Sequence, residues 1–251
     1  MIKDNERLDE INDSLRLIQK KNGLTFGTDA YLLYAYMKRK PNAVAVDLGS
    51  GTGIISLLSL NRNKFRSVHA VEVQESFAEL IVRNAALNSL SDRLFVHHTD
   101  LREMSAQALG GEVDVVFSNP PYMTADSGYH NESEEKLIAR HEIMGGIVDF
   151  CRAANRLLKY GGSFYVVYRT DRLTDLLAAL RQERFEVKRM TFVHGSEKHP
   201  PSFVLLEAKK GGAVGLFVTK PLLLKNAAEE DSVDIKSIYE NGEFDKAYER
   251  P

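Results

Sequence analysis

The feature that most constrains the fold of this chain is a repeated alternation of short β-branched runs with leucine-rich helical segments. Strand-like runs begin at residues 43, 67, 93 and 113, and they read AVAVDL, SVHAVEV, RLFVHHTD and VDVVFS. The segments between the first three runs, IISLLSLNRN and SFAELIVRNAALNSL, have the composition of helices. A helix between two strands returns the chain to the edge at which the first strand began, so the strands run parallel. The sequence therefore predicts an α/β fold with a doubly wound, Rossmann-like and mostly parallel sheet.

The segments that follow continue the alternation and then close the sheet. A helix, a strand and a second helix are predicted over GIVDFCRAANRLLKYGG, SFYVVYR and RLTDLLAALRQERF. The closing strands are predicted at residues 203–210 (FVLLEAKK) and 215–224 (GLFVTKPLLL), where they form an antiparallel pair. The segment from Met123 to Ala139 is polar with little periodicity, so we expect a loop there.

Composition narrows the class of protein. With 251 residues, of which 43% are hydrophobic, the chain can bury one large core. The formal net charge of −2 neither requires nor excludes a nucleic-acid partner. The single cysteine, Cys151, cannot support a disulfide framework. The acidic start MIKDNERLDEIND is unlike a signal peptide and no apolar run reaches ~18 residues, so we expect a cytoplasmic protein without a membrane span.

A glycine-rich turn follows the first strand of the predicted sheet. In VDLGSGTG, Asp47 precedes Gly49, Gly51 and Gly53. Glycines permit positive φ and let the backbone approach a ligand closely, and the helix N-terminus beyond them favours an anionic group. The spacing G-x-G-x-G differs from the G-x-G-x-x-G of dinucleotide-binding proteins. A tight turn with only a structural role is the alternative interpretation of this motif.

Acids also end the next two predicted strands. Glu72 follows the second strand, where its carboxylate can accept hydrogen bonds from both hydroxyls of a ribose, and Asp100 ends the third. The carboxyl ends of parallel strands meet at one edge, which is where open α/β sheets bind their ligands. The alternative for Asp100 is a helix N-cap.

The fourth strand ends in Asn-Pro-Pro-Tyr. Two consecutive prolines cannot donate backbone hydrogen bonds and hold the chain extended, so Pro120 and Pro121 stop the strand. Asn119 offers an amide oxygen, Pro120 offers a carbonyl, and Tyr122 offers a face on which a flat base can stack. Two acceptors placed this way would hold both hydrogens of an exocyclic amine and direct its lone pair at an electrophile.

These motifs resemble a known family. The order VDLGSGTG, VEV, TD and SNPPY is similar to that of the class I S-adenosylmethionine-dependent methyltransferases whose Asn-Pro-Pro-Tyr acts on planar nitrogen. With LTFGTDAYLLYAYM, IARHE, LLKYGGSFYVVYRTDRL and KPLLL, the chain resembles the bacterial tRNA (adenine-N6) methyltransferases that act at position 37 of valine tRNA. The resemblance extends from about Arg7 to about Tyr239. In VHGSEKHPPSFVLLEAKK the chain departs from relatives, whose link is more basic and less proline-rich.

The resemblance implies S-adenosyl-L-methionine as cofactor, tRNA as partner and a role for each motif. Asp47 and the glycines after it would shape the methionine pocket, Glu72 would hold the ribose, and Asp100 with Leu101 would meet the cofactor adenine. Residues 119–122 would hold the target, and Asn119 would also contact the cofactor. The sulfonium methyl is already reactive, so transfer can depend on orientation and on stabilising developing positive charge, without a strong base.

The resemblance also divides the chain. Residues 1–42 would form an N-terminal helical lid or extension, and residues 43–251 the class I methyltransferase catalytic domain, in a single compact unit. In the lid, Thr28 and Asp29 would approach the methionine end of the cofactor. Their alternative role is to cap the helix that follows.

Other acceptors and other classes of protein remain open. The same motif serves glutamine N5 methylation in translation release factors, although fewer than fifty residues precede the glycine turn, too few for the helical domain usual there. Methylation of guanine N2 in ribosomal RNA more often goes with phenylalanine in place of Tyr122. A nucleotide-dependent oxidoreductase is disfavoured by the glycine spacing, and a non-catalytic RNA-binding domain would have no use for the acids.

Basic clusters and aromatic residues are candidates for RNA contact. The clusters lie at Lys20, Lys38, Arg181 and Lys198, and each is also explained as a solvated surface. Near the polar loop, residues able to stack on or contact a flipped nucleotide are Tyr129, His130 and His141. The seven histidines show no metal-binding spacing, so we expect no metal, and we expect a monomer because no apolar patch can be assigned.

Overall fold

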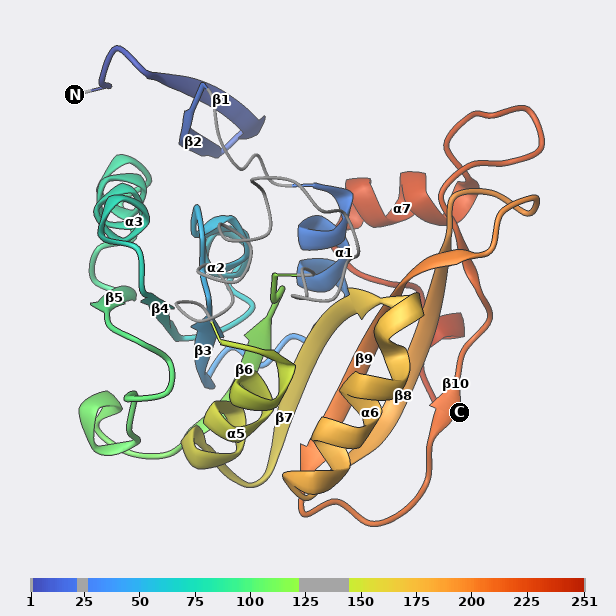
Figure 1. Ribbon diagram of the computed structural model, residues 1–251. Helices are drawn as coiled ribbons and strands as arrows, with labels where there is room; N and C mark the ends of the chain where they lie inside the picture. Colours follow the sequence, from blue (N-terminus) through green and yellow to red (C-terminus); the bar gives the residue numbers. More distant parts are fainter. Residues whose placement is uncertain (1, 22–26, 122–144, 251) are drawn as a thin grey trace, which may run out of the picture.

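The computed structural model describes residues 2–21, 27–121 and 145–250, and Figure 1 shows how their elements are arranged. Five strands form a parallel set: β3 (Val44–Leu48), β4 (Ser67–Glu72), β5 (Leu94–His98), β6 (Val113–Ser118) and β7 (Leu158–Arg169). They lie in the order β7-β6-β3-β4-β5. The chain builds outward from β3 in one direction and then returns to its other side with β6. The predicted doubly wound, mostly parallel α/β sheet is confirmed.

The far side of the sheet contains the antiparallel strand. β9 (Pro201–Lys210) lies between β7 and β8 (Phe185–His194) and is antiparallel to both. The expected antiparallel pairing late in the sheet is therefore confirmed, but the prediction that residues 215–224 pair with β9 is wrong. That segment supplies two short strands, β10 (Phe217–Val218) and β11 (Leu222–Leu223), both parallel to β8. The true partner, β8, is interrupted in sequence by the buried Arg189, which hides its apolar pattern.

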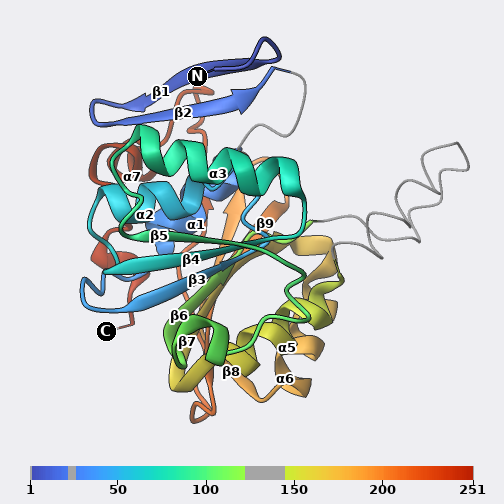
Figure 2. The same ribbon diagram turned by 90° about the vertical axis from the view of Figure 1, so that its left-hand side faces the viewer.

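Helices cover both faces of the sheet. On one face lie α1 (Thr28–Tyr36), α2 (Ile54–Asn61) and α3 (Glu75–Leu87), and on the other lie α5 (Ile147–Leu157) and α6 (Leu173–Gln182), as Figure 2 shows. The C-terminal helix α7 (Val233–Asn241) follows β11 and lies near α1 in Figure 1. Single 3-10 turns lie at Gln107–Leu109, Thr170–Arg172 and Lys246–Tyr248. None of the helices described is long and apolar enough to cross a bilayer.

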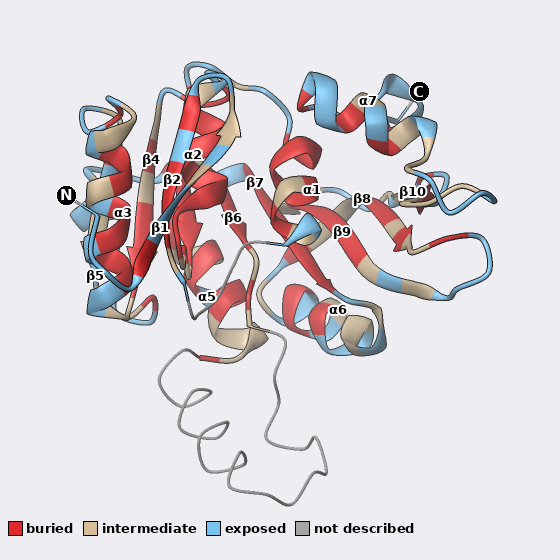
Figure 3. Ribbon diagram, turned by 90° about the horizontal axis from the view of Figure 1, so that it is seen from above, coloured by how far each residue is buried: buried red, intermediate tan, exposed pale blue. Residues whose placement is uncertain are grey.

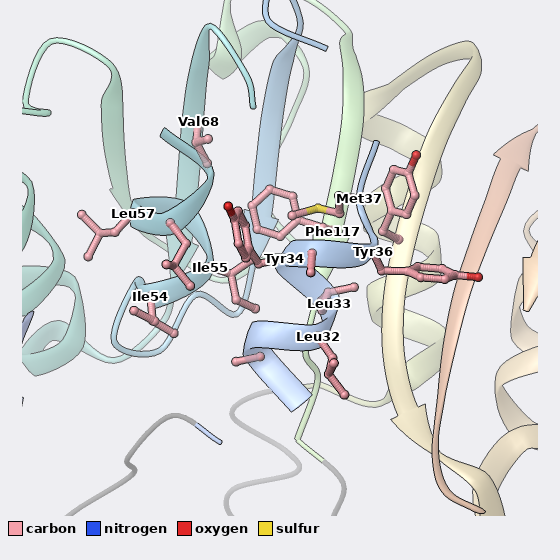
Figure 4. Packing of buried hydrophobic residues seen from close by; sticks show 14 of the residues in the cluster. Leu32, Leu33, Tyr34, Tyr36, Met37, Ile54, Ile55, Leu57, Val68 and Phe117 are labelled. Atoms are coloured by element: carbon pink, nitrogen blue, oxygen red, sulfur yellow. The ribbon is translucent and has the colours of Figure 1, made fainter. Parts of the chain in front are cut away.

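Two hydrophobic cores lie between the sheet and its helices. Side chains alternate along each strand, so in β6 Val115 and Phe117 face α1 and α2, whereas Val116 faces α5. Figure 3 shows that burial is concentrated in the sheet and in the helix surfaces against it. In Figure 4, Tyr34 of α1 and Ile55 of α2 lie near Phe117 of the sheet. The site at the strand ends is therefore carried by elements that are buried on both faces.

The N-terminal segment is a hairpin where a helix was predicted. β1 (Glu6–Asn12) and β2 (Leu15–Lys20) pair antiparallel around a turn in which Asn12 Oδ1 accepts a hydrogen bond from the Ser14 amide at 3.0 Å. Leu15 and Leu17 alternate into the core. This alternation favours a strand, so the helical prediction for residues 1–42 is wrong in this part and holds only for α1.

Side chains of α3 complete the hairpin. Asn84 donates to the Ile18 carbonyl at 3.1 Å and accepts from the Ile18 amide at 2.7 Å. Asn88 does the same for Arg16, at 2.7 and 2.9 Å. The two amides occupy the backbone groups that a further strand would pair with, which explains how a two-stranded hairpin, marginal by itself, is held on the domain.

Two buried basic side chains hold the C-terminal end of α1. Lys64 is 1% exposed, and its Nζ donates to the carbonyls of Tyr34 at 2.9 Å and Met37 at 2.8 Å. Arg189 donates from Nη2 to the carbonyl of Tyr36, and its guanidinium lies 3.7 Å from the centre of the Tyr36 ring. These bonds satisfy carbonyls that a helix end leaves without intrahelical partners. The direction of α1, and the position of its first turn, are fixed by them.

Removing the Arg189 guanidinium should destabilise the fold strongly. Arg189 and Glu207 form an ion pair at 3.3 Å in which both side chains are at most 6% exposed. Arg189→Met leaves the Glu207 carboxylate buried without its cation, which costs about 3–5 kcal/mol of unfolding free energy. Urea denaturation measures this change. Arg181→Met, which breaks an exposed pair with Glu186, is the matched control and should cost less than about 1 kcal/mol; an equal loss in both variants would contradict the assignment.

Candidate active site

The predicted site motifs meet where the strand order reverses. β3 has β4 on one side and β6 on the other, and all three are parallel, so their carboxyl ends lie at one edge. Ser118, at the end of β6, donates from Oγ to the Leu48 carbonyl at the end of β3, at 2.7 Å. This reversal is the place where open α/β sheets form a crevice for ligands.

The glycine turn is held by β4 and by α5. Gly49, Gly51 and Gly53 all have positive φ, between 54° and 78°. The Gly49 amide donates to the Val71 carbonyl at 2.9 Å, and a Cβ at Gly49 would lie 3.2 Å from the ring of Phe150. Both the backbone conformation and the space therefore favour glycine at this position.

Glu72 ties the turn to the end of β4. Its carboxylate is 1% exposed, with Oε2 accepting from the Gly51 amide at 2.8 Å and Oε1 from the Gln74 amide at 2.9 Å. Burial raises the pKa of Glu72, while these amide hydrogen bonds oppose the shift. The side chain is thus fixed at the strand end, beside the glycines.

A hollow opens beside Glu72. Its wall combines acidic, apolar and backbone groups, and its lining residues are Gly49, Val71, Glu72, Val73, Thr99, Asp100, Leu101 and Phe150. Asp100 accepts from the Arg102 amide at 2.8 Å and pairs with the Arg102 guanidinium, which lowers the pKa of Asp100. Carboxylates beside apolar walls suit a ligand with hydroxyls at one end and a flat ring at the other. The structure thus places Gly49, Glu72, Asp100 and Leu101 in one hollow.

Asp47 lies deeper than these residues. It is 1% exposed, does not line the hollow, and accepts a hydrogen bond from Ser56 Oγ of α2 at 2.7 Å. Burial raises the pKa of Asp47 to about 7, with a further rise from the charge of Glu72, while the Ser56 bond opposes it. Near neutral pH this carboxyl is therefore poised between its charged and neutral forms.

Asn119 contacts α1. Its Nδ2 donates to Oδ2 of Asp29, in the first turn of α1, at 2.9 Å. Thr28 begins the helix and is exposed, and the N-cap is Gly27, which lacks a side-chain cap bond. The structure therefore joins the predicted lid to residues 119–122, the predicted target-binding segment, which we call the shelf. No sequence signal indicates this contact, because the two residues are 90 positions apart.

The rest of the shelf is described in part. Pro120 is buried and Pro121 is half-buried, directly after Asn119. Tyr122 lies outside the described residues, as do the predicted loop at 123–139 and the candidate RNA contacts Tyr129, His130 and His141. In the described part of the chain, no group of three or more His, Cys, Asp or Glu side chains could hold a metal ion.

The four basic clusters lie at the two ends of the parallel strands, two at the carboxyl-end edge of the sheet and two at the amino-end edge. Lys20 donates to Ser76 Oγ at the start of α3, just past the carboxyl end of β4, and Lys198 follows the end of β8. Both are at the edge that carries Asn119. Lys38 follows α1 and precedes β3, and Arg181 ends α6 just before β8 begins, so both are at the opposite edge.

Comparison with known proteins identifies the class. Residues 21–190, more than half of the chain, match the family model described as "Methyltransferase small domain". The chain belongs to this family, so it is a methyltransferase. A relative from Phocaeicola vulgatus, named tRNA1(Val) (adenine(37)-N6)-methyltransferase, is 31% identical over 73% of this chain and 76% of its own length. Within the family, the chain belongs with the proteins of that name.

Two further matches agree with this placement. A protein of the same name from Porphyromonas gingivalis is 30% identical over 187 residues, which are 72% of each chain. Among solved structures, a predicted O-methyltransferase from Agrobacterium tumefaciens superposes with a TM-score of 0.68 at 22% identity, over 86% of this chain and 96% of that one. This last similarity supports the fold alone.

Asp47→Asn should change how stability depends on pH. The folded pKa of about 7 lies above the ordinary value of 3.8, so folding favours the protonated form, and wild-type stability falls as pH rises from about 4 to about 7. The asparagine variant lacks this loss. At pH 8 it should be more stable than wild type by at most about 4 kcal/mol, with a smaller difference at pH 5. Urea midpoints at both pH values test this, and a difference that does not vary with pH would contradict it.

Proposed function

We propose that this methyltransferase transfers a methyl group from S-adenosyl-L-methionine to N6 of an adenine in tRNA, at position 37 of valine tRNA. The observation that carries the proposal is the placement of Asn119 and Pro120 next to the glycine turn, with the Asn119 amide held by Asp29. The names of the relatives at 30–31% identity support the same substrate. We further propose that the enzyme is a cytoplasmic monomer, in one catalytic unit from residue 43 onward.

The chemistry of the residues that line the hollow suits the cofactor. Glu72, fixed by two backbone amides, would accept the ribose hydroxyls, and Leu101 with Asp100 would hold the adenine between apolar and acidic walls. The glycine turn leaves room for the methionine portion, since nothing lies within 4 Å of a Cβ added at Gly51. Asp47 is buried behind this turn and bonded to Ser56 of α2, so it would support the turn from the core side. When bound, S-adenosyl-L-methionine supplies an electrophilic methyl group.

The shelf would hold the target base. An exocyclic amine has two hydrogens, and the Asn119 amide oxygen and the Pro120 carbonyl are two acceptors at the end of one strand. We propose that Tyr122 stacks on the extruded base. Holding both hydrogens aims the nitrogen lone pair at the methyl group, and the two acceptors stabilise the positive charge that develops on nitrogen.

A nucleoside assay tests this function. Purified protein is incubated with labelled S-adenosyl-L-methionine and tRNA from cells that lack its gene, and the nucleosides are separated. Label should appear in N6-methyladenosine. Label in a protein fraction alone would favour glutamine methylation of a release factor, and label in N2-methylguanosine would favour a guanine acceptor.

Asn119→Ala should separate binding from transfer in the same assay. The variant loses one acceptor for the target amine, so we expect kcat to fall by about 10²–10³-fold. Cofactor affinity, measured by calorimetry, should stay within about twofold, since Asn119 does not line the hollow. Asn241→Ala, on the exposed end of α7, is the control and should match wild type. Retained turnover in Asn119→Ala would remove the role proposed for this residue.

The location of the basic clusters predicts which lysines contact RNA. Lys20→Ala and Lys198→Ala, at the edge that carries Asn119, should each weaken tRNA binding and reduce the slope of log K against log salt by about 1. Lys38→Ala and Arg181→Ala, at the opposite edge, should change neither. Equal effects in all four variants would indicate a non-specific electrostatic contribution and contradict this prediction.

A further inference from the structure

The contact between Asp29 and Asn119 joins two segments with separate predicted roles. Asp29 lies in the first turn of α1, and Asn119 follows β6 at the centre of the sheet. Their side chains meet at 2.9 Å between Oδ2 and Nδ2, and both are half-buried. The resemblance assigns Asp29 to the methionine end of the cofactor, but here its carboxylate bonds to the residue that would hold the target.

This bond favours one orientation of the Asn119 amide. The oxygen and nitrogen of a terminal amide have nearly the same shape, so the group fits a site in two orientations that differ by a half turn. An ionised carboxylate only accepts hydrogen bonds, so it must meet the NH₂ group. The amide oxygen of Asn119 then points away from Asp29. In the opposite orientation the NH₂ group would face the amine of the target, donor against donor.

The carboxylate also changes the strength of the acceptor. A hydrogen bond from an amide to a charged group is stronger than one between neutral groups and polarises the amide toward its oxygen. This polarisation makes the amide oxygen a better acceptor. Its hydrogen bond to the target amine then strengthens as the target nitrogen gains positive charge during transfer. The anchoring of α1 by Lys64 and Arg189 holds the helix backbone from which the carboxylate extends.

We propose that Asp29 is a positioning residue for methyl transfer: its carboxylate orients the Asn119 amide so that the oxygen, and not the nitrogen, meets the exocyclic amine of the acceptor. This role rests on the function proposed above. It replaces the assignment of Asp29 to cofactor binding.

A neighbouring glycine provides a second way to disturb the contact. Gly27 has φ −102°, which any residue can adopt, so alanine causes no backbone strain there. A Cβ at Gly27 would lie 2.6 Å from Asp29 Oδ1, and the movable atom is the end of a flexible side chain. Gly27→Ala should therefore displace the carboxylate without removing any functional group, at the modest stability cost of an alanine N-cap.

The experiment compares four variants for kcat, cofactor affinity and thermal midpoint. Asp29→Ala should lower kcat by about 10–100-fold at saturating RNA, with cofactor affinity within twofold of wild type. Asp29→Asn keeps one acceptor oxygen and should recover at least about fivefold of the loss, and Gly27→Ala should lower kcat in the same direction. Gly195→Ala, at the same edge of the sheet with no atom closer than 4.0 Å to the added Cβ, is the matched control.

Two results would overturn the proposal: a kcat for Asp29→Ala within twofold of wild type, or a tenfold loss of cofactor affinity with unchanged kcat. A second readout needs no acceptor. The Nδ2 signals of Asn119 in ¹⁵N-labelled protein, identified by their loss in Asn119→Ala, should shift and exchange faster in Asp29→Ala and Gly27→Ala. If wild type places no label in RNA, the proposed function fails, and the amide signals alone then decide whether Asp29 orients Asn119.

Discussion

The parallel pairing of β3 with β6 is the interaction on which the site depends. It brings Leu48, the last residue of β3, within hydrogen-bonding distance of Ser118, the last residue of β6. The two residues are 70 positions apart in the sequence. On one side of this junction the backbone turns through three glycines, and on the other it stops at two prolines. The glycine turn and the proline-containing shelf are thus adjacent because β3 and β6 are paired in parallel, so that their carboxyl ends lie side by side.

The site also requires that α1 be held in position, and buried basic side chains do this. Arg189 and Lys64 occupy the carbonyl end of α1, so the helix whose first turn contacts Asn119 is fixed at its other end. Buried cations carry a large desolvation cost, which here is offset by carbonyls, an aromatic ring and Glu207. Burial also lowers the pKa of Lys64 to about 7, against an ordinary 10.5. The first turn of α1 is therefore positioned by contacts at the other end of the same helix.

What the sequence could predict follows from which signals are local. The parallel strands are visible because each is a short apolar run with a turn signal at its end, and Glu72 and Asp100 are found because they end such runs. β8 is hidden because its interior contains Arg189, whose partner is on another strand. The N-terminal hairpin and the contact of Asp29 with Asn119 are fixed by side chains distant in sequence. Local sequence pattern therefore predicts the strands and turns that carry the site. It does not predict the hydrogen bonds between residues that are distant in sequence.

The amide ladder between α3 and β2 has a geometric consequence. Residues four apart on a helix rise by about 6.0 Å, and residues two apart on a strand advance by about 6.8 Å, so Asn84 and Asn88 match Ile18 and Arg16 almost in step. A shift of the strand by one residue would present its other edge to the two amides and turn Leu17 toward solvent. The two asparagines of α3 therefore allow the hairpin to dock in one register only.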